Sequence, residues 1–149
     1  MSTPDSSSEL ALVTGVYRAT NAIVREVDQR LARDHGVTFV QAITLLAIDS
    51  FESAQPHLVA DYLSQQSQTV TGVLDRLERS DYLLRKRDLK DRRAVRLELT
   101  ALGASLVKSV RPALETAVQE VLKNTTPPLR KRLVDDLRTV ELAISKTPN

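Results

Sequence analysis

The sequence contains no cysteine and no tryptophan, and it has only four glycines. Without cysteine the chain can form no disulfide, no thiolate metal site and no thiol-based redox sensor. The four glycines form no glycine-rich phosphate loop. No apolar run is long enough to cross a bilayer, and the first residues lack the basic and apolar regions of a signal peptide. We therefore expect a cytoplasmic protein that makes no contact with a membrane.

Histidine is also rare, and the sequence gives little support to catalysis. His35 and His57 are the only histidines, and neither has metal-ligand spacing around it. Asp28 and the pair Asp135-Asp136 occur at positions where surface carboxylates are common. We expect His35 at a helix end and His57 in a loop. The sequence thus predicts no metal, no cofactor and no enzymatic activity.

The positive charge of the chain is concentrated in one segment. The 149 residues are 42% hydrophobic, enough for a single domain with a real core, and carry a formal net charge of only +2. Residues 79–96 nevertheless hold eight lysines or arginines against three aspartates, a local charge of +5. A basic patch on a slightly acidic remainder is typical of a protein that binds a polyanion.

Helical periodicity dominates the first half of the chain. Residues 1–8 contain little to bury and predict a disordered tail. A long apolar stripe follows, and His35-Gly36 should end it, with the glycine in the left-handed conformation. Thr38 and Gln41 have capping-box spacing, which predicts a second helix over about residues 39–51. A short helix should follow around residues 58–63.

The segment from Ser67 to Arg79 predicts an amphipathic helix with a distinctive outer face. Val70, Val73, Leu74 and Leu77 recur at helical spacing and should be buried. The opposite side and its flanks carry mostly short polar or basic residues, namely Gln68, Thr69, Thr71, Gly72, Asp75, Arg76 and Arg79. Glutamine can bond adenine at two points, and a threonine methyl can pack on thymine. An ordinary solvated face would look the same, so the helix alone leaves both interpretations open.

The next segment predicts a β-hairpin with a basic tip. Residues 83–87 and 95–99 are strand-like runs, the second strictly alternating, and residues 88–93 form a polar turn. Asp91 and Arg93 share a face in extended backbone, so the carboxylate could hold the guanidinium in place before DNA arrives. A solvated charged loop is the alternative for the turn alone. Helix and hairpin together favour a grip on duplex DNA, with the helix in the major groove and the hairpin beside it.

These residues resemble the winged helix-turn-helix of the multiple-antibiotic-resistance regulator (MarR) family. The most specific part is the string from Asp91 to Thr100, and total length and long flanking helices also fit. The matching residues are Leu63, Thr69-Val70-Thr71, Leu74-Asp75-Arg76-Leu77-Glu78, Asp91-Arg92-Arg93-Ala94-Val95, Leu99-Thr100 and Gly103. The resemblance implies a mainly α fold with a small β-hairpin wing and long dimerisation helices at both ends.

The resemblance also implies a DNA-binding surface. The helix of residues 67–79 would enter the major groove, Arg93 braced by Asp91 would enter the minor groove, and Arg92 and Lys90 would meet phosphates. The full candidate set is Ser67, Gln68, Thr69, Thr71, Arg76, Arg79, Lys86, Arg87, Lys90, Asp91, Arg92 and Arg93. We expect affinity to reside mainly in residues 85–93 and specificity in residues 67–79.

Three positions depart from the family pattern. Gly72 stands where a long polar residue is frequent, and it costs about 1 kcal/mol relative to alanine in a helix. Asp81 stands where a glycine usually follows the recognition helix, although it tolerates a left-handed backbone less well. The usual Gly-Val-Ser entry is replaced by Ser64-Gln65-Gln66, so the helix cap could be Ser64 or Ser67.

The terminal helices predict a homodimer. Thr100 should cap a long helix in which Pro112 could cause a bend, and Thr126 with Pro127 should start the last one. With the first helix, these elements are more apolar than a small winged domain requires. The expected organisation is one domain over residues 9–146, with a DNA-binding lobe at 38–100 and dimerisation helices at 9–35 and 101–146. A monomer whose stripes close one core is the alternative; a dimer would present two recognition helices to an inverted-repeat operator.

Members of the resembling family often release DNA when a small aromatic or phenolic anion binds between the dimerisation helices and the lobe. Tyr17, Asn21, Phe39 and Phe51 are the candidate pocket residues, although core packing also explains the aromatic ones. The family's urate-pocket pattern is not seen, since tryptophan is absent. The implied function is a dimeric regulator, in the form of a repressor of an efflux or catabolic operon. The alternative is a winged-helix module that binds another protein.

Overall fold

The computed structural model describes residues 7–145, which form six helices and one two-stranded hairpin. The predicted fold class, mainly α with a hairpin wing, is confirmed. None of the described helices is long and apolar enough to cross a membrane. The elements in chain order are α1 Ser8–His35, α2 Phe39–Ser50, α3 Pro56–Tyr62, α4 Ser67–Arg79, β1 Leu83–Arg87, β2 Val95–Leu99, α5 Ala101–Val121 and α6 Pro127–Ser145.

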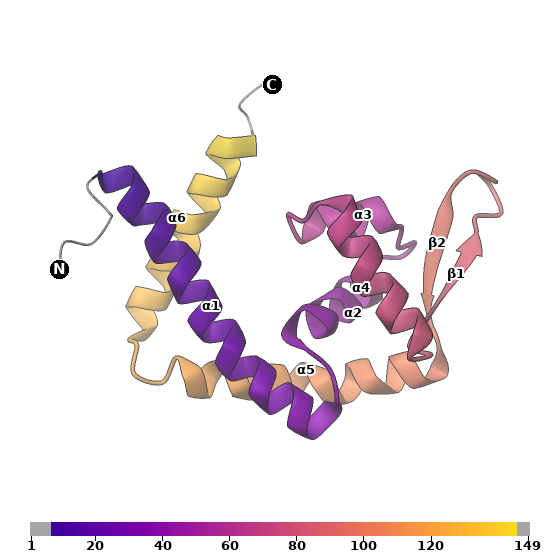
Figure 1. Cartoon of the computed structure of the whole chain (residues 1–149), viewed down its shortest axis with the longest axis horizontal. Coiled ribbons are helices and arrows are strands. Elements are labelled where there is room, and N and C mark those ends of the chain that lie inside the picture. Colours follow the sequence, from indigo (N-terminus) through magenta and orange to yellow (C-terminus); the bar gives the residue numbers. More distant parts are fainter. Residues whose placement is uncertain (1–6, 146–149) are drawn as a thin grey trace.

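Helix α5 is the support on which the other elements are arranged. In Figure 1 it lies along the bottom of the view, with α2, α3, α4 and the hairpin above its first half. Helix α1 crosses it, and α1 and α6 rise together on the opposite side of the picture from the hairpin. We call residues 38–100 the winged lobe, and residues 8–22 with 127–145 the helical arm.

Local sequence signals set most helix ends. Gly36 adopts the left-handed conformation with φ 67°, and its N–H donates to the Ala32 carbonyl at 3.1 Å. Thr38 and Gln41 form the predicted capping box, in which each side chain accepts a hydrogen bond from the other residue's backbone N–H. These contacts set the C-terminus of α1 and the N-terminus of α2, both as predicted.

The predicted start of α1 and the two proposed N-caps of α4 differ from the structure. Residues 1–6 of the expected tail lie outside the described part of the chain, but Ser7 caps α1 by accepting from the Leu10 N–H at 3.2 Å, so α1 begins at Ser8. Helix α4 has Gln66 as its N-cap, without a side-chain cap bond, and neither proposed serine caps it. Ser64 instead has φ 50°, and its hydroxyl donates to Glu141 of α6 at 3.0 Å.

The hairpin strands span the predicted residues. They pair antiparallel from Leu83 opposite Leu99 to Arg87 opposite Val95. The N–H of Leu97 also donates to the carbonyl of Ala54 at 2.8 Å, which ties β2 to the loop between α2 and α3. The base of the wing is thus part of the lobe.

Buried apolar residues form two clusters. The first lies inside the winged lobe and includes the predicted stripe of α4, namely Val70, Val73, Leu74 and Leu77. The second joins the C-terminal half of α1 to α2 and α5 and is built around Val27, Leu31, Val110 and Leu114. Helix α6 contributes no buried residue to either cluster.

A tight joint connects the end of α4, the start of the wing and α5. Asp81 takes the left-handed conformation at φ 60°, at the position where the resembling family usually has glycine. Thr100 caps α5 by accepting from the Gly103 N–H at 2.9 Å, while its own hydroxyl donates to the Asp81 carbonyl at 2.6 Å. An added Cβ at Gly103 would lie 1.9 Å from the Tyr82 carbonyl oxygen. Only glycine fits this approach without a backbone shift.

Candidate nucleic-acid interface

The outer face of α4 is accessible as expected. Its predicted contact residues are all exposed, and Asp75 is half-buried; the exposed set is Ser67, Gln68, Thr69, Thr71, Arg76 and Arg79. An added Cβ at Gly72 would meet nothing within 4 Å, so the helix presents open backbone there. The first turns of α4 therefore present short, exposed side chains, and at Gly72 the helix backbone itself is accessible.

Two of these side chains are already bonded to α4 itself. The Thr71 hydroxyl donates to the Ser67 carbonyl at 2.8 Å, and the Arg79 Nε donates to the Asp75 carbonyl at 3.3 Å. With its proton used, Thr71 can still accept a hydrogen bond or present its methyl group. Gln68 donates and accepts no side-chain hydrogen bond within the described chain, so its amide is available to a partner.

Arg85 points toward the lobe, contrary to the expectation that the whole of residues 85–93 supplies affinity. Its guanidinium donates to Asp75 Oδ1 at 2.7 Å and to Glu78 Oε2 at 2.5 Å, and its side chain is only 25% exposed. Burial disfavours the charged form, but the bonds to the two carboxylates outweigh this and raise the pKa of Arg85. Arg85 therefore locks β1 to the recognition helix and is not free to bind a phosphate.

Lys86 is also engaged inside the hairpin. Its Nζ lies 2.6 Å from Glu98 Oε2, and Arg96 contacts the same carboxylate at 3.5 Å. The hydrogen bond from Lys86 is the main cause of the lowered pKa of Glu98. Lys86 stays more than half exposed, so it can add to the local positive potential without pointing freely at a partner.

Backbone contacts organise the wing tip. Asp88 Oδ1 accepts from the N–H of Lys90 at 2.7 Å and from that of Asp91 at 3.4 Å. Asp91 Oδ1 accepts from the backbone N–H of Arg93 at 2.9 Å. The predicted brace on the Arg93 guanidinium is wrong, because no ion pair joins these two residues in the described chain. An aspartate two residues before an N–H closes a turn, and here it fixes the Arg93 backbone while the side chain stays free.

Four basic side chains of the hairpin have no ion-pair partner among residues 7–145: Arg87, Lys90, Arg92 and Arg93. All four are exposed. Together with the open face of α4 they form a continuous candidate interface made from one helix and one hairpin. Such unpaired guanidinium and ammonium groups are the ones that can neutralise phosphates.

A crevice connects the two parts of this interface. Its volume is about 340 Å³. The residues that line it are Gln55, Pro56, His57, Ser67, Thr71, Arg93, Ala94 and Val95. The sequence-based set contained three of these residues but neither Gln55 nor His57. No local pattern marked them, since they come into place only when α3 packs against α4.

Comparison with known proteins identifies this arrangement. Residues 35–94 match the sequence profile of the MarR family, which spans α2 to the wing tip. The matched part is therefore the winged helix-turn-helix of this chain. The transcriptional regulator SarZ of Staphylococcus epidermidis is 27% identical over 124 residues, which cover 82% of this chain and 80% of SarZ.

Solved structures share the MarR fold over almost the whole chain. A mutant of MarR from E. coli, complexed with operator DNA, has a TM-score of 0.82 at 23% identity and covers 93% of this chain and 99% of its own. BpsR of Bordetella bronchiseptica, whose DNA binding is regulated by 6-hydroxynicotinic acid, has a TM-score of 0.80 at 24% identity, with 99% of each chain covered. The chain therefore has the same fold as these two DNA-binding proteins.

The four candidate effector residues do not meet within the single chain. Tyr17 and Asn21 lie on the exposed half of α1, while Phe39 packs against the second buried cluster. Phe51 packs against the first cluster and makes an edge-to-face contact with Tyr62 at a centroid distance of 6.0 Å. Core packing thus accounts for the two phenylalanines.

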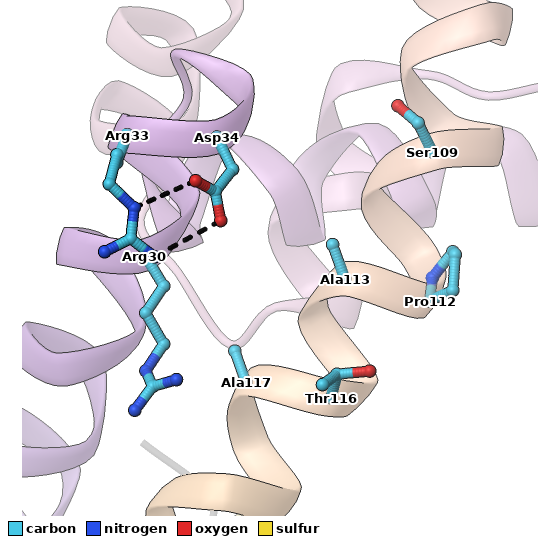
Figure 2. A pocket seen from close by; sticks show the side chains of 8 residues that line it. All are labelled: Arg30, Arg33, Asp34, Ser109, Pro112, Ala113, Thr116 and Ala117. Atoms are coloured by element: carbon cyan, nitrogen blue, oxygen red, sulfur yellow. Dashed lines mark hydrogen bonds and ion pairs between the residues drawn. The ribbon is translucent and has the colours of Figure 1, made fainter.

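A separate groove lies between α1 and α5. Its volume is about 400 Å³, and Figure 2 shows Arg30 reaching along the opening toward Thr116 and Ala117. Arg33 and Asp34 form a two-point pair at its rim, which lowers the pKa of Asp34. The groove is open and only partly basic.

Proposed function

We propose that the chain binds an inverted-repeat operator as a homodimer and represses an efflux or catabolic operon until a small aromatic anion releases it. The observation that carries the DNA-binding part is the open, short-chained face of α4 beside the unpaired arginines of the wing. The dimer and the effector are argued below, whereas the operon class rests only on the resemblance to the MarR family.

Helix α4 is the proposed major-groove element. Its first turns present Gln68, Thr69 and Thr71 without a long side chain that would hold the helix off the bases. Glutamine reads adenine at two points in the major groove, and the Thr methyl group can contact thymine. Arg76 and Arg79, further along the helix, are proposed to meet the flanking phosphates.

The wing is the proposed second contact. Asp88 and Asp91 hold the backbone of the tip, so that Arg92 and Arg93 project from an ordered turn. An ordered turn loses less entropy when it binds. Arg93 is proposed to enter the minor groove, and Lys90, Arg92 and Arg87 are proposed to meet phosphates. Lys86 contributes mainly to the local positive electrostatic potential.

The apolar surface of the helical arm supports a dimer. On α1 and α6, large apolar side chains remain exposed in the single chain, among them Leu12, Val13, Leu133, Val134, Leu137 and Ile144. Exposed patches of this kind mark protein interfaces. A two-fold dimer would present two α4 helices to two half-sites about one helical turn apart.

A small aromatic anion is the proposed effector, which requires different affinities for the two states of the protein. Tyr17 and Asn21 are exposed on α1, on the surface that the second copy would cover. Salicylate is a suitable probe. We expect it to weaken DNA binding, and Tyr17→Ala to reduce this response; a response unchanged by Tyr17→Ala would remove that residue from the site.

The salt dependence of binding to duplex DNA tests the function. Each phosphate contact contributes about −0.9 to the slope of log affinity against log salt. A regulator should show a steep slope and a preference for one sequence selected from a random pool. A flat slope, with a defined acidic protein as partner, would favour the protein-binding alternative.

The wing is tested by Arg93→Ala. We expect about a tenfold loss of affinity, because a charge-assisted contact is lost, and an unchanged unfolding curve. Arg25→Ala is the matched control, since it removes the same charge from an exposed site on α1 outside the lobe. Equal effects of the two variants would contradict the assignment.

Gln68→Ala tests direct reading by α4. We expect a relaxed preference at one base pair in each half-site, worth about 1 to 3 kcal/mol. The measurement is a comparison of affinities for the selected duplex and for single-position variants of it. Equal losses on selected and random DNA would reduce Gln68 to a backbone contact.

A further inference from the structure

The crevice between α3, α4 and the wing contains a histidine to which the preceding description assigns no role. His57 is the second residue of α3 and is exposed, while Ser67 begins α4 and Arg93 follows the wing tip. All three residues line the same crevice of 340 Å³. Three residues distant in sequence, which carry an imidazole, a hydroxyl and a guanidinium, thus line one crevice.

These donor groups are not used inside the protein. Within residues 7–145, the imidazole of His57, the hydroxyl of Ser67 and the guanidinium of Arg93 make no hydrogen bond or ion pair. Arg85 shows the contrast, since both of its terminal nitrogens are bonded to carboxylates. Thr71 also lines the crevice, but its hydroxyl donates to the Ser67 carbonyl. Three free donors converging on a crevice call for an acceptor from outside.

The charge around the crevice favours an anion. No carboxylate is among the eight residues that line it. On α3 the nearest acidic residue in sequence is Asp61, one turn beyond His57, and the loop before α3 carries Glu52; neither lies within ion-pair distance of the imidazole. Helix α4 contributes only the uncharged Ser67 and Thr71 here, and the wing contributes Arg93.

We propose that His57 and Ser67 bind one phosphate of the DNA backbone, beside the point where Arg93 enters the minor groove, and that this contact strengthens when His57 takes up a proton. The inference rests on the proposed DNA-binding function. In a helix-turn-helix the second helix enters the groove while the first crosses the backbone, so His57 on α3 faces phosphate rather than base edges. A phosphate only accepts hydrogen bonds, which matches the free donors of His57 and Ser67.

Protonation changes what His57 can offer. A neutral imidazole has one N–H, whereas the cation has two and adds a positive charge. If the complex holds the cation better than the free protein does, one proton is taken up per bound half-site. Linkage then makes the affinity fall as pH rises, by at most tenfold per pH unit for each proton. We expect a loss of about fivefold per half-site between about pH 6 and about pH 8.

The chain offers a matched control because it has only two histidines. His35 lies in the last turn of α1, outside the crevice. The experiment measures the dissociation constant of the full chain for a short random-sequence duplex at both pH values, since a phosphate contact needs no operator. The variants are His57→Gln, His57→Lys and His35→Gln, each checked by circular dichroism at both values.

The expected results differ for each variant. The wild type and His35→Gln should lose affinity in parallel as pH rises, His57→Gln should lose most of this dependence, and His57→Lys should bind well at both values. A wild type that binds DNA without pH dependence, or His57→Gln that keeps the full dependence, would overturn this inference alone. A wild type that fails to bind duplex DNA at either pH would overturn the proposed function together with it.

Discussion

The winged lobe and the helical arm differ in how far their apolar side chains are buried within a single chain. In the lobe, Val70 and Leu77 on α4 are 3% and 1% exposed within a single chain. In the arm, Leu133 and Leu137 on α6 are 47% and 46% exposed, although they too recur at a helical spacing. A single chain thus buries the apolar face of α4 in the lobe but leaves the apolar side chains of α6 in the arm exposed.

This difference indicates that the two regions are stabilised by different partners. Most helical stability in proteins comes from burying an apolar face rather than from helix propensity. α4 has that burial from α2, α3 and the hairpin, while α6 lacks it in one chain. The lobe therefore buries its apolar face within one chain, whereas the arm leaves apolar side chains exposed that the proposed dimer would cover.

The largest effect should come from an acidic residue on the arm. Leu137→Glu should raise the dimer dissociation constant by at least about 100-fold, because each copy loses about 1.5 to 3 kcal/mol of apolar burial. Sedimentation equilibrium measures the change. Leu84→Glu is the matched control, since Leu84 in the lobe is 43% exposed but lies outside the arm. A Leu137→Glu chain that stays dimeric would refute the assigned interface.

The next effect concerns the joint between lobe and α5. Gly103→Ala should lower the free energy of unfolding by about 2 to 3 kcal/mol, since its Cβ would collide with the Tyr82 carbonyl and the backbone must shift. Gly72→Ala is the control in a helix of the lobe, where the new Cβ meets nothing. We expect that variant to gain up to about 1 kcal/mol.

Urea unfolding of the two glycine variants at one protein concentration tests this pair. Equal stability changes would mean that the close approach at Gly103 is relieved cheaply. If Gly72→Ala also weakens DNA binding while it stabilises the fold, the open backbone at Gly72 is a site of close approach to DNA.

A smaller effect separates two kinds of arginine in the lobe. Arg85→Ala should cost about 1 kcal/mol of stability, because Asp75 and Glu78 lose their partner while staying partly solvated. Arg92→Ala should change stability by less than about 0.5 kcal/mol but weaken DNA binding. Thermal unfolding measures the stability of both variants, and DNA titration measures their affinity. Equal changes in both quantities for the two variants would contradict this division of roles.

The sequence was sufficient where the cause is local. The alternation of residues 95–99, the stripe of α4 and the pair Thr38 and Gln41 act over a few residues, and each prediction from them is confirmed. The N-cap of α4 was missed because Gln66 uses no capping side chain. Local patterns carry no signal for a cap of that kind.

The site was less predictable because its contacts are tertiary. Arg85 meets Asp75 and Glu78 only after the wing folds onto α4, so its charge was wrongly assigned to the DNA surface. His57 joins the crevice only through the packing of α3 on α4. Asp91 was placed beside Arg93 correctly, but the choice between guanidinium and backbone N–H depends on the turn geometry, which spacing alone does not give.

The smallest effect concerns the wing tip, the part of the lobe farthest from its core. The N–H groups of Lys90 and then of Asp91 lower the pKa of Asp88. A carboxyl whose folded pKa lies below its unfolded value stabilises the fold above its ordinary range, and this stabilisation is lost as pH falls through the lowered pKa. Acid should therefore loosen the tip.

Asp88→Asn should loosen the tip already at neutral pH, because the amide is a weaker acceptor than the carboxylate. We expect faster amide exchange at Lys90 and about a twofold to fivefold loss of DNA affinity, since Arg92 and Arg93 would have to be ordered on binding. Asp136→Asn on α6 is the control. Unchanged exchange at Lys90 would show that the turn orders itself without the charge, and the lobe would then be rigid to its tip while the arm alone depends on a partner.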